Sequence, residues 1–237
     1  MSPLLSLGFF LGMRHALDAD HVAAVAALAT RSPSLANVMR LAAAWGLGHT
    51  VTLLVLGSIL LAVDASLPPI AGRVFEGGVG VMLVVLGIDV LRRIRKRRIH
   101  LHVHDHGDGR RHLHVHAHEH ENAHDPARHD HAHVSRLLPR AVVVGTVHGV
   151  AGTGAVTLLS LEALDSYVSA IAYLMLFGLG SILGMMLFSV AISVPLRLSA
   201  RHLGWASSGL EAALGLATIV LGCWMSAQAA VLGIAAG

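Results

Sequence analysis

The chain of 237 residues has few charged and few aromatic side chains. Only 13% of its residues are Asp, Glu, Lys or Arg, and 4% are aromatic, whereas soluble domains carry roughly 25% charged residues. Its single cysteine, Cys223, excludes an internal disulfide framework and a cysteine-based zinc site. Hydrophobic residues make up 54% of the chain. With so little polar surface, we expect an integral membrane protein rather than a soluble one.

Six stretches are long and apolar enough to cross a bilayer, which takes about 20 residues. The predicted spans are Leu4–Ala29, Val38–Val63, Ile70–Leu91, Leu138–Leu161, Val168–Leu196 and Ser207–Ile234. Helix breakers separate most of them, namely Ser32-Pro33-Ser34, Pro68-Pro69 and the stretch from Leu196 to Gly204 after Pro195. No predicted span contains the His-Glu-x-x-His pattern of zinc hydrolases, so the chain is not expected to be an enzyme.

The two halves of the chain repeat each other. Gly12-Met-Arg-His15 aligns with Gly145-Thr-Val-His148 at an offset of 133 residues, and Gly46-Leu-Gly-His49 aligns with Gly178-Leu-Gly-Ser181 at an offset of 132. At an offset of 135, Glu76, Gly80, Leu86 and Gly87 align with Glu211, Gly215, Leu221 and Gly222. Because three helices per half is an odd number, the halves are expected to run in opposite directions, as in many transporters. The expected fold is therefore all-α, with about six transmembrane helices in two inverted three-helix repeats, residues 1–91 and 138–237.

The loop between the repeats, residues 92–137, is basic and rich in histidine. The stretch from Arg92 to Arg140 holds 11 of the 17 Lys and Arg residues. The positive-inside rule places this loop in the cytoplasm and both termini outside, in the cytoplasmic membrane. A basic cluster beside a span is expected to contact lipid headgroups and not nucleic acid.

The same loop holds 13 of the 18 histidines, between His100 and His133, interleaved with Asp and Glu. Such a tract cannot form a packed core and is predicted to be disordered. Because neutral imidazole is the commonest metal ligand, we interpret the tract as a metal buffer or sensor. A solvated linker that binds metal only incidentally is the alternative.

The first predicted span contains ionisable residues that a bilayer disfavours: Arg14, His15, Asp18, Asp20 and His21. Each costs about 2.5–3.5 kcal/mol on insertion scales. Arg14 and Asp18 can pair four residues apart on a helix. Imidazole and carboxylate together suit nickel, cobalt, zinc or iron(II).

In an unbroken helix, His15 and His21 lie about 9 Å apart along the axis, too far to share one metal easily. Either the helix breaks between them, or only part of the set binds at once. Asp18 is either a ligand or the partner of Arg14.

Two further histidines are candidates for metal binding. His49 lies in Gly46-Leu-Gly-His-Thr50, and His148 is the repeat partner of His15 within a glycine-rich segment that favours a helix interruption. A pseudo-two-fold arrangement would bring His15 and His148 near one another. The predicted metal site thus comprises His15, Asp18, Asp20, His21, His49 and His148, and no prosthetic group is expected.

The segment His15-Ala-Leu-Asp-Ala-Asp20-His21 resembles the His-x4-Asp-His signature of the nickel/cobalt transporter (NiCoT) family, and Gly46-Leu-Gly-His-Thr50 resembles its Leu-Gly-His-Ser/Thr motif. His148-Gly-Val-Ala-Gly-Thr-Gly154 is similar to the urease-accessory-type permeases of the broader superfamily, and the histidine-rich loop to its nickel/cobalt exporters. The chain departs from NiCoT proteins in having six predicted helices instead of eight, and in lacking their Phe-Asp-Thr-x-Thr-Glu motif.

The resemblance implies a permease for Ni²⁺ or Co²⁺ with His15, Asp20 and His21 as its functional core, and His49 added by its own motif. An efflux protein of the same superfamily and a membrane-tethered metal buffer or sensor are the alternatives. The expected partners are the divalent metal ion, membrane lipid, and cytoplasmic metallochaperones or maturation proteins of urease or hydrogenase. The sequence favours neither nickel over cobalt nor uptake over efflux.

Overall fold

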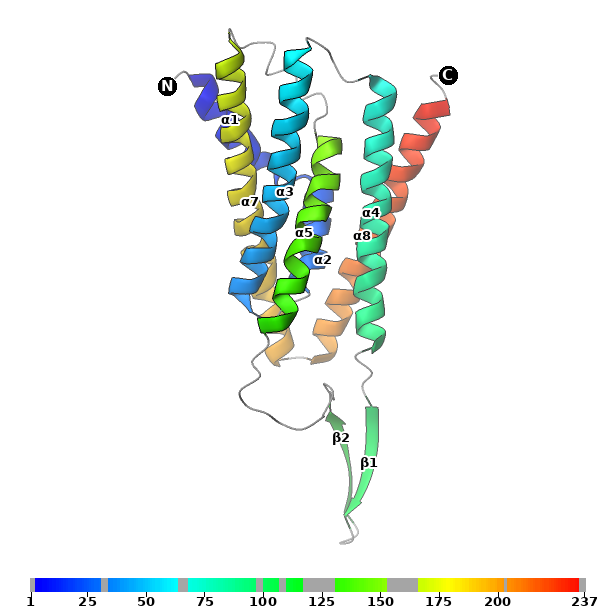
Figure 1. Ribbon diagram of the computed structural model, residues 1–237. Helices are drawn as coiled ribbons and strands as arrows, with labels where there is room; N and C mark the ends of the chain where they lie inside the picture. The colour runs from blue at the N-terminus through cyan, green and yellow to red at the C-terminus, as the bar shows by residue number, and fades with distance from the viewer. Residues whose placement is uncertain are drawn as a thin grey trace.

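The computed structural model describes residues 3–30, 34–63, 68–96, 100–106, 110–116, 131–152, 166–202 and 204–234. They form helices α1 (Pro3–His15), α2 (Ala19–Ala29), α3 (Leu35–Ala62), α4 (Pro69–Lys96), α5 (His131–Gly152), α7 (Tyr167–His202) and α8 (Gly204–Ile234), and strands β1 (His100–His106) and β2 (Arg110–His116). The helices stand side by side in one bundle, with the start of α1 and the end of α8 at one end and the β1–β2 hairpin beyond the other (Figure 1). The expectation of a helical protein is confirmed for these residues.

Four of the described helical segments are long and apolar enough to cross a membrane: Leu35–Ala62, Ile70–Arg95, Tyr167–Leu198 and Ser208–Val231. Two more apolar segments, Ala19–Ala29 and Leu137–Ala151, are shorter. The predicted span Leu138–Leu161 is described only as far as Gly152, and its remainder lies outside the described residues. These helices are those of an integral membrane protein.

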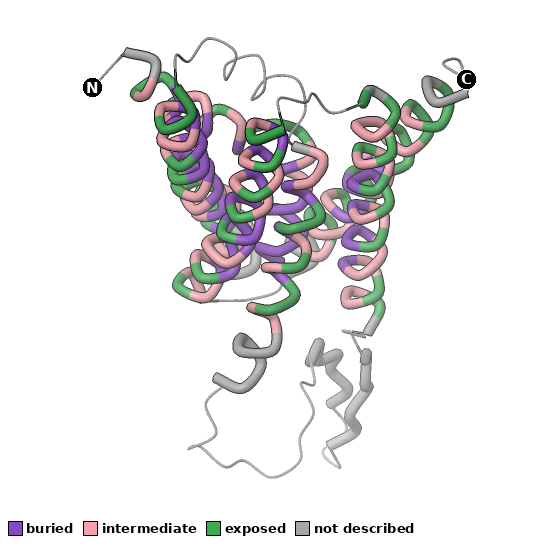
Figure 2. Tube along the Cα trace, turned by 45° about the horizontal axis from the view of Figure 1, so that its top comes forward, coloured by how far each residue is buried: buried purple, intermediate pink, exposed green. Residues whose placement is uncertain are grey.

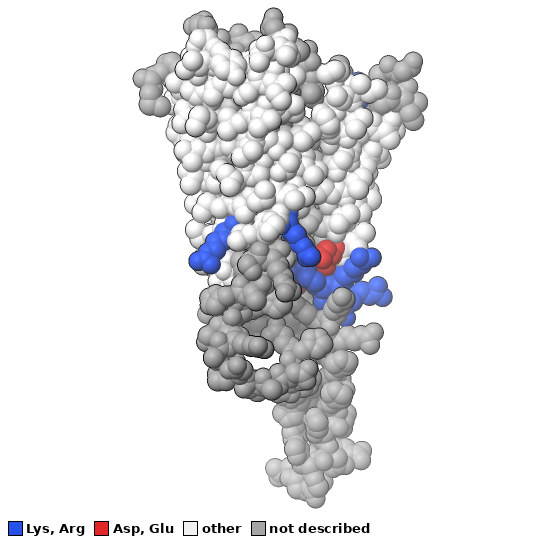
Figure 3. Space-filling model, viewed as in Figure 1, with Lys and Arg blue, Asp and Glu red and all other residues white. Residues whose placement is uncertain are grey.

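The outer surface of the bundle also suits lipid. Phe10, Val74 and Val168 are 64%, 66% and 76% exposed, as side chains that face acyl chains would be. On the face shown in Figure 3, the helices carry a broad surface without charge, and Lys and Arg gather at the hairpin end. Arg92 near the end of α4 and Arg140 in α5 belong to the elements that meet this end. The bundle thus has an apolar girdle and one basic end.

The first predicted span is two helices, because the chain leaves helical geometry after His15. Asp18 precedes α2 with an extended backbone (φ −62°, ψ 147°). A break between His15 and His21, one of the two alternatives drawn from the sequence, is therefore confirmed. The predicted pair of Arg14 with Asp18 needs a continuous helix and is wrong for the described geometry, in which Asp18 bonds to His15.

Two other local expectations also fail. Pro195 does not end its helix, since α7 continues through it to His202. A proline removes one backbone hydrogen bond, and membrane helices tolerate this where neighbouring groups satisfy the carbonyl that is left free. The loop is also shorter than expected, because α4 extends to Lys96 and α5 begins at His131.

The histidine-rich tract was expected to be disordered, but the structure places parts of it in two antiparallel strands. The register pairs His100 with His116, Leu101 with Val115, and His102 with His114. Histidine alternates with Leu or Val along both strands, which is the two-residue period of a β-strand. The periodicity favours this hairpin, and disorder of the tract as a whole stays a prediction.

The core surrounds the break between α1 and α2. Ala16, in the break, is fully buried, as are Trp45 of α3, Leu83 of α4 and Met185 of α7, all in one apolar cluster. Buried residues concentrate where the helices face one another inside the bundle (Figure 2). The polar residues of the break are thus held in a packed interior.

Glycines allow two pairs of helices to touch along their backbones. A Cβ atom on Gly12 of α1 would collide with the carbonyl oxygen of Phe177 on α7, and one on Gly145 of α5 with the carbonyl oxygen of Trp45 on α3. Small residues at such crossings are the usual means of close packing in membranes. These close backbone contacts hold α1 against α7 and α5 against α3.

Replacing Gly145 by alanine is expected to destabilise the bundle by about 1–3 kcal/mol, the usual cost of overpacking. The measurement is thermal unfolding in detergent, followed by tryptophan fluorescence. Gly78→Ala in α4 is the matched control, because a Cβ there meets nothing within 4 Å. Equal unfolding temperatures for the two variants would contradict the close approach of α5 to α3.

Candidate metal centre

Four histidines meet inside the bundle. His15 ends α1, His21 lies in the first turn of α2, His49 in the middle of α3, and His148 near the end of α5. The ring of His21 lies 4.4 Å from that of His15, 5.3 Å from that of His49 and 4.0 Å from that of His148, between centroids. The helix break thus brings together two histidines that a continuous helix would separate.

Burial is nearly complete for this group. His21, His49 and His148 have at most 1% of their surface exposed, and the His15 side chain is 19% exposed. Imidazole rings in such a position need hydrogen-bond partners or ligands, because a buried polar group without one costs about 1–3 kcal/mol.

Asp20 links the two histidines at the start of α2 and the end of α5. Its Oδ1 lies 3.2 Å from Nδ1 of His21 and accepts a 3.0 Å hydrogen bond from the His21 backbone N–H. Its Oδ2 lies 3.2 Å from Nε2 of His148, which in turn lies 3.1 Å from Nδ1 of His21. One carboxylate therefore contacts two rings that also contact each other.

Several ring nitrogens in this group are buried and unpartnered among the described residues: Nε2 of His15, Nε2 of His21, both nitrogens of His49 and Nδ1 of His148. Two sets of three side chains, His15 with His21 and His49, and Asp20 with His21 and His148, each bring potential ligand atoms within 4.8 Å of one another. Imidazole and carboxylate donors in this arrangement suit a divalent first-row transition metal.

Asp18 belongs to neither set. Its side chain is 57% exposed, and its Oδ2 lies 2.8 Å from Nδ1 of His15. A carboxylate that binds the second nitrogen of a histidine fixes the orientation of the ring. The structure thus brings five of the six predicted residues into the two sets and places Asp18 behind one of them.

Aromatic residues that were not predicted from the sequence pack on these rings. Phe177 lies 5.4 Å from His15, and Trp45 lies 5.5 Å from His148, between ring centroids. The repeat alignment contained a signal for them, since they directly precede the aligned residues Gly178 and Gly46.

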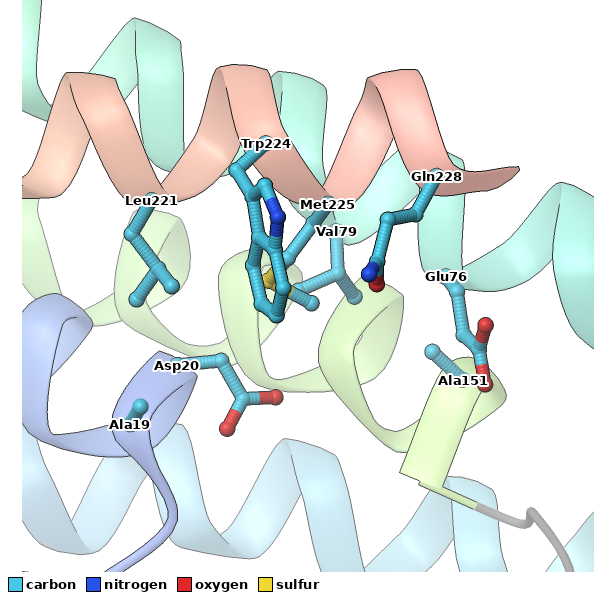
Figure 4. Close-up of a pocket in the computed structure, with 9 residues that line it drawn as sticks. All are labelled: Ala19, Asp20, Glu76, Val79, Ala151, Leu221, Trp224, Met225 and Gln228. Atoms are coloured by element: carbon cyan, nitrogen blue, oxygen red, sulfur yellow. The ribbon is translucent and has the colours of Figure 1, made fainter. Parts of the chain in front are cut away.

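A cavity of about 350 Å³ adjoins the centre, between α2, α4, α5 and α8. Figure 4 shows its lining residues, which are Ala19, Asp20, Glu76, Val79, Ala151, Leu221, Trp224, Met225 and Gln228. Because Asp20 lines the cavity and also contacts His21 and His148, the cavity borders the candidate metal centre.

Fold and site together have the features of a helical membrane protein with a buried histidine–aspartate cluster. The chain is 31% identical to the urease accessory protein UreH of Bacillus sp. (strain TB-90) over 215 residues, which cover 84% of this chain and 80% of the relative. It belongs to the family of that protein. No family model and no solved structure matches the chain.

This kinship is with an accessory protein and confirms that the chain is not an enzyme. The His-Glu-x-x-His pattern does occur once in the sequence, at His120–His124. That segment belongs to the histidine-rich tract and lies outside the described residues. It has no described relation to the centre in the bundle.

The centre predicts a specific pattern of cobalt binding in detergent. In a variant without residues 99–130, which removes most loop histidines, we expect Co²⁺ to bind with the visible absorption of a histidine–carboxylate site. Since loss of a partner behind a ligand costs roughly 10–100-fold in affinity, Asp18→Asn should weaken binding about tenfold and His49→Ala more. His202→Ala, outside the centre, is the control. Unchanged affinity in His49→Ala would exclude His49 as a ligand.

Proposed function

We propose that the chain is a permease that carries Ni²⁺ or Co²⁺ across the cytoplasmic membrane, with the ion held by His15, Asp20, His21, His49 and His148. The observation that carries this proposal is the convergence of buried, unpartnered ring nitrogens at a helix break inside a membrane bundle. Transporters commonly bind their ions at such interrupted helices. Kinship with a urease accessory protein favours nickel as the cargo.

The proposal includes two inverted repeats, which helix directions and contacts support. In Figure 1, α3 and α7 run in opposite directions, as do α4 and α8. A Cβ on Gly80 would lie 2.6 Å from the carbonyl oxygen of Gly222, and one on Gly87 would lie 2.6 Å from that of Gly215. Gly80 and Gly215, like Gly87 and Gly222, are 135 positions apart. One contact is therefore the repeat image of the other.

The aromatic residues around the centre are also related by the repeat. His15 packs on Phe177 at 5.4 Å, and His148 packs on Trp45 at 5.5 Å. The histidines are 133 positions apart and the aromatic residues 132. A site at the interface of inverted repeats can be exposed to each side in turn by movement of one half against the other.

Contacts at the two ends of the bundle support a state that faces the termini. The cavity is lined by Asp20, by Glu76 in the first half of α4 and by Gln228 in the last turns of α8. The start of α4 and the end of α8 lie at the end of the bundle at which α1 begins (Figure 1). Towards the other end, Arg93 of α4 holds the last turn of α2: its Nη1 donates to the carbonyl oxygen of Thr30 at 3.1 Å, and its Nη2 donates to that of Ala27 at 3.4 Å. Alternation would require this contact to be released.

The basic hairpin end is assigned to the cytoplasm, and the termini to the outside, by the positive-inside rule. With Cys223 replaced by serine, an added Ser2→Cys should react with a membrane-impermeant maleimide in intact cells. Gly109→Cys should react only after permeabilisation. The measurement is the labelled fraction of each purified variant, and the reverse pattern would contradict this orientation.

Metal flux into or out of proteoliposomes tests the permease directly. We expect saturable Ni²⁺ or Co²⁺ movement in the wild type, its loss in His21→Ala, and its retention in His202→Ala. The sequence has no Gly-x4-Gly-Lys-Ser/Thr motif for ATP, so the energy must come from a gradient or a partner. Comparing flux with metal supplied from either side distinguishes uptake from efflux. Normal flux in His21→Ala would remove the centre from the mechanism.

A membrane-tethered buffer or sensor is a second candidate, favoured by the hairpin register. The pairing of His100 with His116, His102 with His114 and His104 with His112 places histidines at opposing positions on the two strands. In the same flux assay, the variant without residues 99–130 separates the candidates. A permease retains flux and the metal bound at its centre and loses only the metal bound by the histidine-rich tract, whereas a buffer loses its function.

A further inference from the structure

Glu76 is an ionisable residue inside an apolar span. It is the eighth residue of α4 and lies within the candidate span Ile70–Arg95, about 10 Å from the start of the helix at 1.5 Å per residue. Stabilisation of a glutamate by the helix dipole is confined to roughly the first turn. The position of Glu76 therefore needs another explanation, and ionisable groups in spans commonly mark ion pathways.

The cavity beside the metal centre supplies that explanation. Figure 4 shows Asp20 on one side of it and Glu76 with Gln228 on the other, with the indole of Trp224 between them. Arg73, one turn before Glu76, lines a separate cavity with Val74 and Ser226. The polar side-chain groups of the cavity beside the centre are thus two carboxylates, one amide and the indole N–H of Trp224, and no Lys or Arg is among its lining residues.

Its walls strengthen the attraction of these groups for a cation. Val79, Leu221 and Met225 line the space between the polar residues, and apolar walls focus the field of a carboxylate and raise the local concentration of counter-ions. The volume of about 350 Å³ accommodates several waters at about 30 Å³ each. A cation can therefore enter with much of its hydration shell.

We propose that Glu76 and Gln228 form an outer cation station, in which a hydrated divalent ion is held by oxygen atoms before or after it contacts Asp20 and the histidines. The inference rests on the proposed permease and adds a second, weaker binding position to it. Oxygen groups also accept hard cations such as Mg²⁺, whereas the imidazoles of the inner centre select transition metals. The station collects divalent cations, and the centre discriminates among them.

The repeat provides a matched control. Glu211 is the eighth residue of α8, as Glu76 is of α4, and the two are repeat partners. Glu211 is not among the residues that line the cavity. The two glutamates therefore have the same charge and the same place in their helices but differ in their access to the centre.

The test measures Ni²⁺ flux in proteoliposomes at varied metal, salt and Mg²⁺ concentrations. Glu76→Gln should raise the half-saturating Ni²⁺ concentration about fivefold or more, from the loss of local attraction, and leave Co²⁺ binding to the histidine centre in detergent unchanged. Wild-type half-saturation should rise with added salt, which screens the carboxylate, and with millimolar Mg²⁺. The effects of salt and of Mg²⁺ on half-saturation should be smaller in Glu76→Gln. They should be unchanged in Glu76→Asp and Glu211→Gln. Gln228→Leu should reduce the effect of Mg²⁺ without removing a charge.

Three results would overturn the station. One is that Glu76→Gln keeps the half-saturating Ni²⁺ concentration and the Mg²⁺ sensitivity of the wild type, while His21→Ala is inactive. The permease would then stand without the outer cation station. A second is an equal change in Glu211→Gln, which would indicate a general charge effect. The third is loss of Co²⁺ binding in both Glu76→Gln and Glu76→Asp, which would make Glu76 a structural residue. Absence of metal flux in the wild type would instead overturn the permease itself.

Discussion

The interruption between α1 and α2 is the constraint on which the candidate metal centre depends. A continuous helix would hold His15 and His21 about 9 Å apart along its axis, whereas the break brings their rings to 4.4 Å. It also places Asp20 at the start of α2, where its carboxylate meets both His21 and His148. Irregular backbone at membrane depth is tolerated only inside protein or along a wet cavity. The buried Ala16 and the cavity at Asp20 satisfy that condition.

The close glycine crossings complement this break. The partners of the centre come from α3 and α5, and their separation depends on how near these helices approach each other. Gly145 allows α5 to rest on the backbone of α3 at Trp45, and Trp45 in turn packs on His148. A bulkier residue at Gly145 would therefore move His148 away from Asp20 as well as loosen the bundle. Packing and ligand geometry are set by the same contacts.

Much of the membrane core could be predicted from the sequence, because apolar runs and buried charges are strong local signals. The excess of ionisable residues in the first span identified His15, Asp20 and His21, and the distance between the two histidines made a break one of two open alternatives. Contacts between distant segments could not be predicted in this way. Arg93 has the sequence context of a basic topology signal, and only the fold shows that it holds the end of α2. Nothing in the sequence likewise indicates that Trp224 and Gln228 line the cavity, because this depends on the packing of α8 beside α2 and α4.

The arrangement of the donors agrees with a protein that must release its ion. Structural metal sites are usually closed by four protein ligands, whereas sites that exchange ligands keep a position open. Here two sets of three side chains share His21, and its two ring nitrogens point in different directions, so one ion cannot take both from the same ring. In the proposed permease, an ion in one set would have three of these side chains as ligands and keep exchangeable water, and passage to the other set would bring in the remaining two. Such a site would suit the proposed permease, which has to select a transition metal and then release it on the other side of the membrane.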